Sequence, residues 1–320
     1  MARVKGIHHV TCIAGDPQQN LDFYTAVLGL RLVKRSVNQD DPGTYHLFYA
    51  DAEGHPGTDI TFFPWPHLAA GRQGVGLTVE VALAVEPESL GFWAQRLARH
   101  GVRSGEPEVR FGERVLPFSD VHGLALALVE TADPRELTPW SESPVPEARQ
   151  IKGIHAVRLW ERELAETAGF LTTALGFGTV GEDRGWHRFG LAGGGSGRIL
   201  DVRELPGEPR GRWGVGSVHH VAWRVADVDA ERAVRERVAA AGRRPTAVID
   251  RFWFESVYFT EPGGALFEIA TDGPGFAIDE DVAALGERLI LPPWLEPRRP
   301  EIERALPPLR LHELPQAPSP

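Results

Sequence analysis

The chain repeats a short pattern of residues, and this repeat restricts its fold more than any other feature. The pattern GIHHV at residues 6–10 returns as GIHAV at 153–157, and LGL at 28–30 returns as LGF at 175–177. A second similar pair, FSDVHG at 118–123 and FTEPGG at 259–264, precedes an apolar stretch in each case. The sequence therefore holds four modules, near residues 4–66, 74–131, 151–204 and 216–272. Each module is too short to bury a core alone, so we expect the modules to pair.

Each module is expected to contain a strand, then a helix, then several strands. In the first module, residues 7–13 favour a strand, and Asp16 with Pro17 supplies the cap and first turn of a helix over 18–27 that stops at Gly29. Further strands are expected near 32–37, 45–50 and 59–63. The fourth module repeats this βαβββ order, with its helix near 228–241. The pattern predicts an α+β fold in which four βαβββ modules pair into two open β-barrels.

Composition changes mark the borders of these units. We expect two modules within residues 1–135, a linker rich in proline, glutamate and serine at 136–150, and two further modules at 151–275. Residues 276–320 are rich in proline and predict a C-terminal tail that wraps the outside, with a short helical stretch near 279–290.

Charge and composition exclude several classes of protein. A net charge of -10 argues against nucleic acid as a partner, because phosphate binding needs concentrated positive charge. No apolar run is long enough to span a bilayer, so no membrane partner is expected. The single cysteine, Cys12, excludes an internal disulfide and a cysteine-based metal cluster and fits a reducing compartment. With an N-terminus that lacks the features of a secretory signal, this predicts a cytoplasmic protein. A homo-oligomer is compatible with the sequence.

One carboxylate stands in an apolar strand pattern. Glu268 lies within GALFEIA at residues 264–270. Burying an ionised carboxylate there is costly unless it meets a cation or several hydrogen-bond donors. A metal ligand is the favoured interpretation, and the alternative is a strand whose exposed face lets the carboxylate reach solvent.

Two histidine doublets occupy the same place in two modules. They are His8 with His9 and His219 with His220. Because side chains alternate along a strand, only one member of each doublet should reach a metal directly, and we predict His9 and His220 as ligands together with Glu268. Two imidazoles and one carboxylate suit a non-haem Fe(II) site with open positions.

The other modules lack this ligand set. Ala156 stands where module three would supply its second histidine, after His155, and Ala127 takes the place of Glu268 in module two. Modules one and four must therefore share the metal-bearing barrel, and the other barrel should hold no metal.

Several polar residues are candidates for the surroundings of the metal. Arg251 suits an anionic oxygen, and Tyr258 suits a substrate hydroxyl or dioxygen. A structural salt bridge and a packing tyrosine are the alternatives for these two. Thr11 follows His9 on the same face, His219 is the proposed acid–base group, and His8 either supports the site or faces away. Two further histidines, His46 and His187, have no evident partner, and we favour structural roles for them.

The chain resembles the vicinal oxygen chelate superfamily, and within it the four-module dioxygenases that open hydroquinone rings. The likeness rests on residues 6–17, 58–65, 218–222, 266–276 and 291–294. It implies Fe(II), or Mn(II) as in some relatives, held by His9, His220 and Glu268. It implies Thr11, His219, Arg251 and Tyr258 around the substrate, with His8 retained as a catalytic candidate. The expected partners are a small aromatic para-diol and O2.

Two other functions are compatible with this resemblance. A glyoxalase-type isomerase needs a second carboxylate, but Phe62 and Ala127 fill the corresponding places. A drug-binding resistance protein needs no metal and would leave the histidines and Glu268 unexplained.

Overall fold

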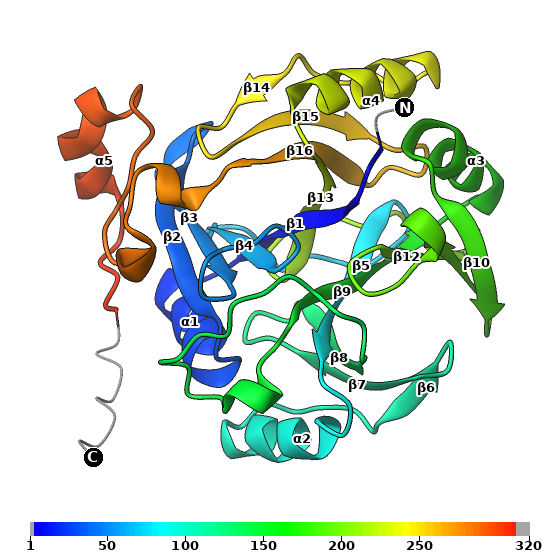
Figure 1. Ribbon diagram of the computed structural model, residues 1–320, viewed down its shortest axis with the longest axis horizontal. Coiled ribbons are helices and arrows are strands. Elements are labelled where there is room, and N and C mark those ends of the chain that lie inside the picture. Colours follow the sequence, from blue (N-terminus) through cyan, green and yellow to red (C-terminus); the bar gives the residue numbers. More distant parts are fainter. Residues whose placement is uncertain (1–2, 312–320) are drawn as a thin grey trace.

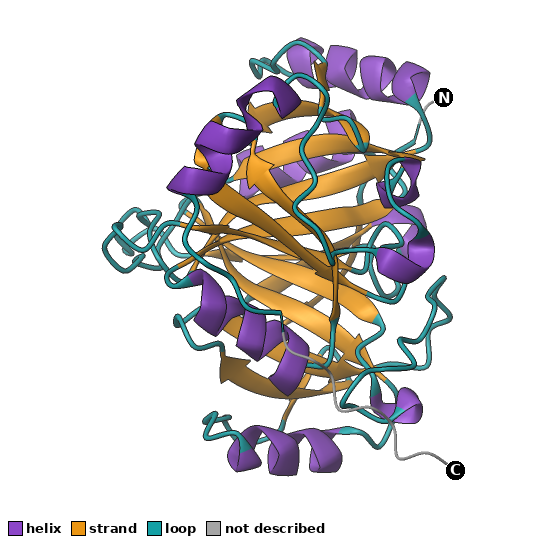
Figure 2. Cartoon of the chain, turned by 90° about the vertical axis from the view of Figure 1, so that its left-hand side faces the viewer, coloured by secondary structure: helices purple, strands orange, loops and turns teal. Residues whose placement is uncertain are grey.

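Two eight-stranded, curled sheets form the body of the protein, and the predicted α+β fold of paired βαβββ modules is confirmed. The computed structural model describes residues 3–311. The strands of one sheet lie toward the upper left of Figure 1 and those of the other toward the lower right. Helices cover the outer sides of the strands, and loops link the two halves (Figure 2).

The first sheet joins the two ends of the chain. Its order is β14-β15-β16-β13-β1-β4-β3-β2, and the antiparallel pair β1 and β13 lies at its centre. Module one and module four therefore build one sheet. Their strands are β1 (Gly6–Ala14), β2 (Arg31–Asn38), β3 (Asp41–Ala50), β4 (Asp59–Pro64), β13 (Ser217–Val225), β14 (Ile249–Asp250), β15 (Phe254–Thr260) and β16 (Leu266–Pro274).

The second sheet combines modules two and three in the same way. Its order is β10-β11-β12-β9-β5-β8-β7-β6, with the antiparallel pair β5 and β9 at the centre. The strands are β5 (Leu77–Val85), β6 (Glu108–Arg110), β7 (Glu113–Ser119), β8 (Ala125–Glu130), β9 (Gly153–Glu161), β10 (Gly178–Asp183), β11 (Trp186–Gly190) and β12 (Ile199–Glu204).

Each module carries one helix after its first strand. In module one, the Asp16 side chain accepts a hydrogen bond from the Gln19 amide, and Pro17 takes the first turn, as the sequence predicts. The last turn, Phe23–Val27, widens into a π-helix before Gly29 adopts a left-handed conformation. The helices are α1 (Pro17–Asp22), α2 (Leu90–Arg99), α3 (Leu164–Phe170) and α4 (Val228–Ala240).

Strand alternation separates the two faces of the first sheet. Val10 and Val221 are completely buried in the large core cluster, together with residues of the helices. Ala222 belongs instead to a second apolar cluster, which includes Phe48 and Trp253. The helices thus cover one face, while the other face of the sheet is left to line an interior pocket.

The segment between the two module pairs is packed against module one. Residues 136–150 form no strand, and their helical structure is a single 3-10 turn, Glu147–Arg149. The Thr138 amide donates to Asp51, and the Ser143 hydroxyl donates to the Gly29 carbonyl. These bonds hold the segment to the outside of the first barrel.

The C-terminal segment lies along β2 and β3, with its helix at the left of Figure 1. The predicted helical stretch near 279–290 is wrong, because only a 3-10 turn, Val282–Ala284, forms there. The helix of this segment, α5, comes later, at Arg299–Ala305. Residues 312–320 of the predicted tail lie outside the described residues.

A buried lysine anchors this segment. The Nζ atom of Lys34 on β2 donates to the Phe276 carbonyl at 3.1 Å, to Asp279 at 2.7 Å and to Glu280. The side chains of Lys34 and Glu280 are completely buried. Lone buried charges are costly, so this ion pair ties the segment to the barrel.

Candidate metal centre and pocket

The histidine doublets meet at the central strand pair of the first sheet. Thr11 on β1 is paired with His220 on β13, and His9 is paired with Ala222. The pairing shifts between Ile7 and His9, and again between Thr11 and Cys12. His8 and His219 are therefore the extra residues at two bulges, which change the direction of a side chain relative to simple alternation.

Three buried side chains converge on one point. His9 Nε2 lies 3.3 Å from His220 Nε2 and 3.3 Å from Glu268 Oε2, and His220 Nε2 lies 2.9 Å from the same carboxylate oxygen. All three residues are buried. Ligand atoms in neighbouring positions around an ion, with bonds of about 2.1 Å, lie about 3 Å apart. The separations and the donor set thus fit a divalent metal, and the structure brings together the three predicted ligands.

Glu268 is prepared to act as an anion. It lies on β16 beside Ala222 and Tyr258, and its Oε1 accepts a hydrogen bond of 2.5 Å from Ser256. Burial acts to raise the pKa of Glu268, but a positive charge or a proton on the His9 and His220 imidazoles outweighs this effect and holds the pKa well below its usual range. Its Oε2 has no hydrogen-bond donor among the described residues and faces the two imidazoles. That oxygen is free to bind a cation.

The outer histidine of the first doublet fixes the tautomer of His9. His8 Nε2 lies 3.1 Å from the Thr271 carbonyl, which can only accept, so this nitrogen carries the proton. Burial, above all, lowers the pKa of His8 to about 3, so the ring is neutral and its Nδ1 is an acceptor. That atom lies 2.9 Å from His9 Nδ1, which must then donate. His9 Nε2 is left with a lone pair directed at the cluster.

The second doublet repeats the arrangement. His219 Nδ1 lies 2.8 Å from His220 Nδ1, and burial lowers the pKa of His219 to about 3. The His219 ring stacks on Trp213 at 4.7 Å and meets the edge of Phe63 at 5.5 Å. Burial also lowers the pKa of His220, so its ring is neutral and one of its nitrogens keeps a lone pair.

A pocket opens above the three converging side chains. Phe48, Phe63, Trp253 and Phe254 supply aromatic walls, and its polar lining includes Asn38, Gln39, Asp40, His46, Arg251 and Tyr258. Of the residues that the sequence predicts around the substrate, Arg251 and Tyr258 therefore line the pocket.

The pocket mouth is held by an ion pair. Arg251 contacts Asp40 at 2.9 Å, and its guanidinium lies 5.4 Å from the Tyr258 ring centre. Burial, followed by the charge of Glu268, raises the pKa of Tyr258, so its hydroxyl stays protonated. Thr11 is fully buried, and its Oγ1 lies 2.8 Å from that of Thr61.

Sequence reasoning missed His46 as a pocket residue. His46 and Phe48 stand two residues apart on β3, so they share one face of the strand, and both line the pocket. The ring of His46 lies 3.9 Å from that of Phe48. The available signal was this alternation next to an aromatic residue. His187 lies on β11 of the second sheet, 3.7 Å from Glu182. It does not correspond to His46, because Arg188 pairs with Asp201 as Phe48 pairs with Thr61, and this register makes Trp186 the counterpart.

The pairing registers also correct the predicted counterpart of Glu268 in module one. Ala222 pairs with Glu268 in module four, and Thr11 pairs with Thr61 in module one. The counterpart of Glu268 in module one is therefore Thr61 and not Phe62, whose side chain belongs to the large core. The predicted counterpart in module two, Ala127, does pair with Ala82 at the equivalent place.

Ion pairs occupy the equivalent region of the second barrel. Ala156 replaces the first histidine ligand there, and Glu80 lies opposite Arg158 on the paired strand. Arg158 lies 3.7 Å from Glu80 and 3.9 Å from Asp201, and Arg188 binds Asp201 at 2.8 Å. These described residues balance one another in charge, and no three of them form a metal-ligand cluster.

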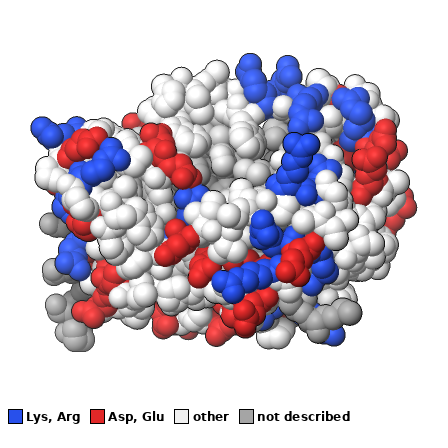
Figure 3. Space-filling view, turned by 90° about the horizontal axis from the view of Figure 1, so that it is seen from above, with Lys and Arg blue, Asp and Glu red and all other residues white. Residues whose placement is uncertain are grey.

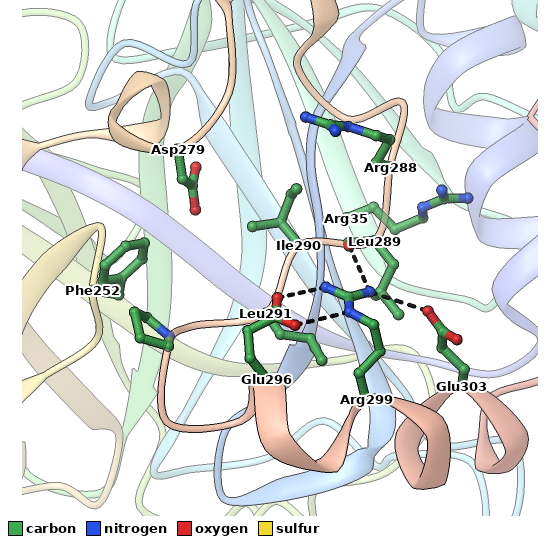
Figure 4. A pocket seen from close by; sticks show the side chains of 11 residues that line it. Arg35, Phe252, Asp279, Arg288, Leu289, Ile290, Leu291, Glu296, Arg299 and Glu303 are labelled. Carbon is green, nitrogen blue, oxygen red and sulfur yellow. Dashed lines mark hydrogen bonds and ion pairs between the residues drawn. The ribbon is translucent and has the colours of Figure 1, made fainter.

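Two surfaces outside the pocket carry clusters of charged side chains (Figure 3 and Figure 4). On the face shown in Figure 3, acidic side chains accompany the basic ones. Figure 4 shows a groove between β2 and the C-terminal segment, in which Arg299 is clamped by Glu296 and Glu303. Within residues 3–311, no helix has the length and apolar character needed to cross a membrane.

The chain belongs to the Glyoxalase/Bleomycin resistance protein/Dioxygenase superfamily, whose family model matches residues 6–132 and 153–269. Its sequence is 42% identical over 312 residues to MhqO of Bacillus subtilis, which is provisionally named a ring-cleaving dioxygenase, and the match covers 98% of this chain and 99% of MhqO. It is 32% identical to the chlorohydroquinone/hydroquinone 1,2-dioxygenase of Sphingobium indicum, over 95% of this chain and 96% of that enzyme.

Solved structures agree with this assignment. A crystal structure of a Bacillus subtilis protein, provisionally named a dioxygenase, superimposes with a TM-score of 0.93 at 41% identity and covers 98% of this chain and 100% of that one. Glyoxalase I of Zea mays gives a TM-score of 0.62 at 16% identity, over 83% of this chain and 92% of that one. At that identity, the maize enzyme shares the fold alone.

Proposed function

We propose that this protein is a metal-dependent dioxygenase that opens the ring of hydroquinone-like para-diols. The observation that carries the proposal is the convergence of His9, His220 and Glu268 at the base of an aromatic pocket. The full-length similarity to a hydroquinone 1,2-dioxygenase supports it. Two imidazoles and one carboxylate favour Fe(II), with Mn(II) as the second candidate.

His9, His220 and Glu268 would hold the metal, which when bound would supply open coordination positions and redox chemistry for the diol and O2. Arg251 lies on the pocket wall, where its fixed positive charge would stabilise an anionic oxygen of the substrate. Tyr258, next to Glu268, would donate a hydrogen bond from its protonated hydroxyl. Thr11 is not among the residues that line the pocket, and its hydroxyl contacts that of Thr61.

The two outer histidines have different environments. Both nitrogens of His8 are engaged by His9 and the Thr271 carbonyl, so we assign His8 the task of positioning His9. His219 contacts His220 through Nδ1 alone. Its Nε2 has no hydrogen-bond partner among the described residues, and because burial lowers its pKa the ring is neutral, so we propose His219 as a base that would accept a proton from the substrate.

Substrate entry requires a rearrangement at the mouth. The pocket measures about 40 Å³, which is less than the cavity of about 150 Å³ that holds benzene in a well-studied case. The Asp40–Arg251 pair lies at this place, and Asp40 is exposed to solvent. Asp40 lies in the turn between β2 and β3, and its separation from Arg251 would open the pocket to an aromatic ring.

The test uses protein purified without oxygen and loaded with Fe(II) or Mn(II). We expect oxygen uptake and a ring-opened product with hydroquinones, and loss of both in Glu268→Gln. Conversion of a hemithioacetal without oxygen uptake would support a glyoxalase-type isomerase instead. Tight binding of aromatic drugs by metal-free protein, without turnover, would support a resistance protein.

We also propose a cytoplasmic location. The single cysteine, Cys12, is buried and unpaired, which suits a reducing compartment. Fractionation of cells that express the protein, followed by immunodetection, tests this location.

A further inference from the structure

His46 occupies a special position in the internal symmetry of the first barrel. Phe48 pairs with Thr61 in module one, just as Tyr258 pairs with Glu268 in module four. Two residues before these aromatic side chains stand His46 and Ser256. The symmetry thus places His46 where module four places the hydrogen-bond donor of the metal-binding carboxylate.

The hydrogen bonds follow the same symmetry. Ser256 Oγ donates to Glu268, and His46 Nε2 lies 3.0 Å from Thr61 Oγ1. Thr61 Oγ1 in turn lies 2.8 Å from Thr11 Oγ1. Since hydroxyls both donate and accept, this chain permits either neutral tautomer of His46. Burial lowers the pKa of His46 well below its usual value, so the ring is neutral.

The row of paired residues sets the direction from the metal site to His46. His220, Thr11, Thr61 and Phe48 are successive partners across β13, β1, β4 and β3. Neighbouring strands lie about 4.8 Å apart, so Thr61 is about 10 Å from His220 along the sheet. His46 binds Thr61, and therefore lies toward the module-one end of the pocket, away from Glu268 and Tyr258.

His46 also retains an unused polar atom. Three other polar lining residues already have partners. Asn38 accepts hydrogen bonds from two backbone amides of the turn, Gln39 donates to the Arg251 carbonyl, and Asp40 forms an ion pair with Arg251. The Nδ1 of His46 has no hydrogen-bond partner within the described part of the chain. The ring itself is held between Phe48 at 3.9 Å and Phe63 at 4.4 Å.

We propose that His46 determines specificity by hydrogen-bonding the second hydroxyl of a para-diol whose first hydroxyl is held at the metal site. This inference rests on the proposed function. In a para-diol the second hydroxyl projects from the far end of the ring, toward module one. In an ortho-diol it stays beside the first and cannot reach that wall. His46 would thus favour hydroquinones over catechols.

The test is anaerobic titration of metal-loaded protein with hydroquinone, catechol and phenol. His46→Phe keeps an aromatic ring between Phe48 and Phe63 but removes both nitrogens. We expect hydroquinone affinity to fall by about tenfold or more, with phenol and catechol affinities within about twofold of wild type. Thr61→Val, which removes the partner that orients His46, should give a smaller loss in the same direction. His187→Phe, on β11 of the other barrel, should change nothing.

Metal content measured in parallel separates a pocket effect from loss of the ion. An equal effect of His46→Phe on all three ligands, or no effect on any, would overturn the assignment. Wild-type protein that binds hydroquinone no better than phenol would also overturn it, whether or not oxygen is consumed. Absence of oxygen uptake by the wild type, with hydroquinone still preferred, would refute the proposed reaction and leave the role of His46 in binding intact.

Discussion

Replacing His8 with phenylalanine removes the acceptor that fixes which nitrogen of His9 carries a proton. In the wild type, His9 Nδ1 donates to His8 at 2.9 Å, and His8 donates to the Thr271 carbonyl at 3.1 Å. Without His8, the buried His9 Nδ1–H loses its acceptor, and the ring can protonate Nε2 instead. A protonated Nε2 cannot bind a metal.

The expected loss in metal affinity follows from this arrangement. Removing a partner of a metal-binding histidine costs about 10–100-fold in affinity, or about 1.4–2.8 kcal/mol. An unsatisfied buried donor costs about 1–3 kcal/mol, which agrees with this range. Phenylalanine can fill the site, because the His8 ring already lies 5.2 Å from that of Phe254. Glu268→Gln should lose more, since it removes the anionic charge of the site.

The assay is competition for Fe(II) or Mn(II) between the protein and a chelator of known affinity, under anaerobic conditions. His155→Phe is the matched control, because His155 has the same place in the repeat but contacts Ser196 and Glu113 in the barrel without the ligand set. Its metal affinity should equal that of the wild type. If His8→Phe binds metal as tightly as the wild type, the tautomer argument fails.

Two further predictions concern stability. Lys34→Met should lower the free energy of unfolding by about 3–5 kcal/mol, because Glu280 stays buried without its cation, and Lys34→Met with Glu280→Gln should recover part of the loss; urea unfolding measures both. Burial and the neighbouring Glu261 raise the pKa of Glu161 to about 9, so the folded protein keeps a proton that the unfolded chain releases above its usual pKa. Stability from this group therefore falls as pH rises from about 4.5 to about 9. Compared with the wild type, Glu161→Gln should raise the urea midpoint more at pH 8 than at pH 5, whereas the exposed control Glu163→Gln should not. A pH dependence of Glu161→Gln equal to that of the wild type would contradict this account.

Local patterns in the sequence predicted the modules, the α+β fold and the residues that could bind a metal. Strand and helix periods are properties of neighbouring residues, so the repeat at 6–10 and 153–157 was sufficient to show copies of one unit. Glu268 stood out because an isolated carboxylate in an apolar strand needs a partner. Because module one has His9 where module three has Ala156, the sequence also indicated which barrel holds the metal ligands.

The contacts among these residues were decided only by the tertiary structure. The bulges that aim His8 and His219 at the inner histidines arise from the pairing of β1 with β13, more than 200 residues apart along the chain. The same registers make Thr61 the counterpart of Glu268 and put His46 on the pocket wall. A shift of one residue in register would reverse every side chain on a strand, and alternation within one segment cannot fix the register with another. The sequence by itself therefore determined which groups this protein has for chemistry, and the pairing of distant strands determined which of them meet.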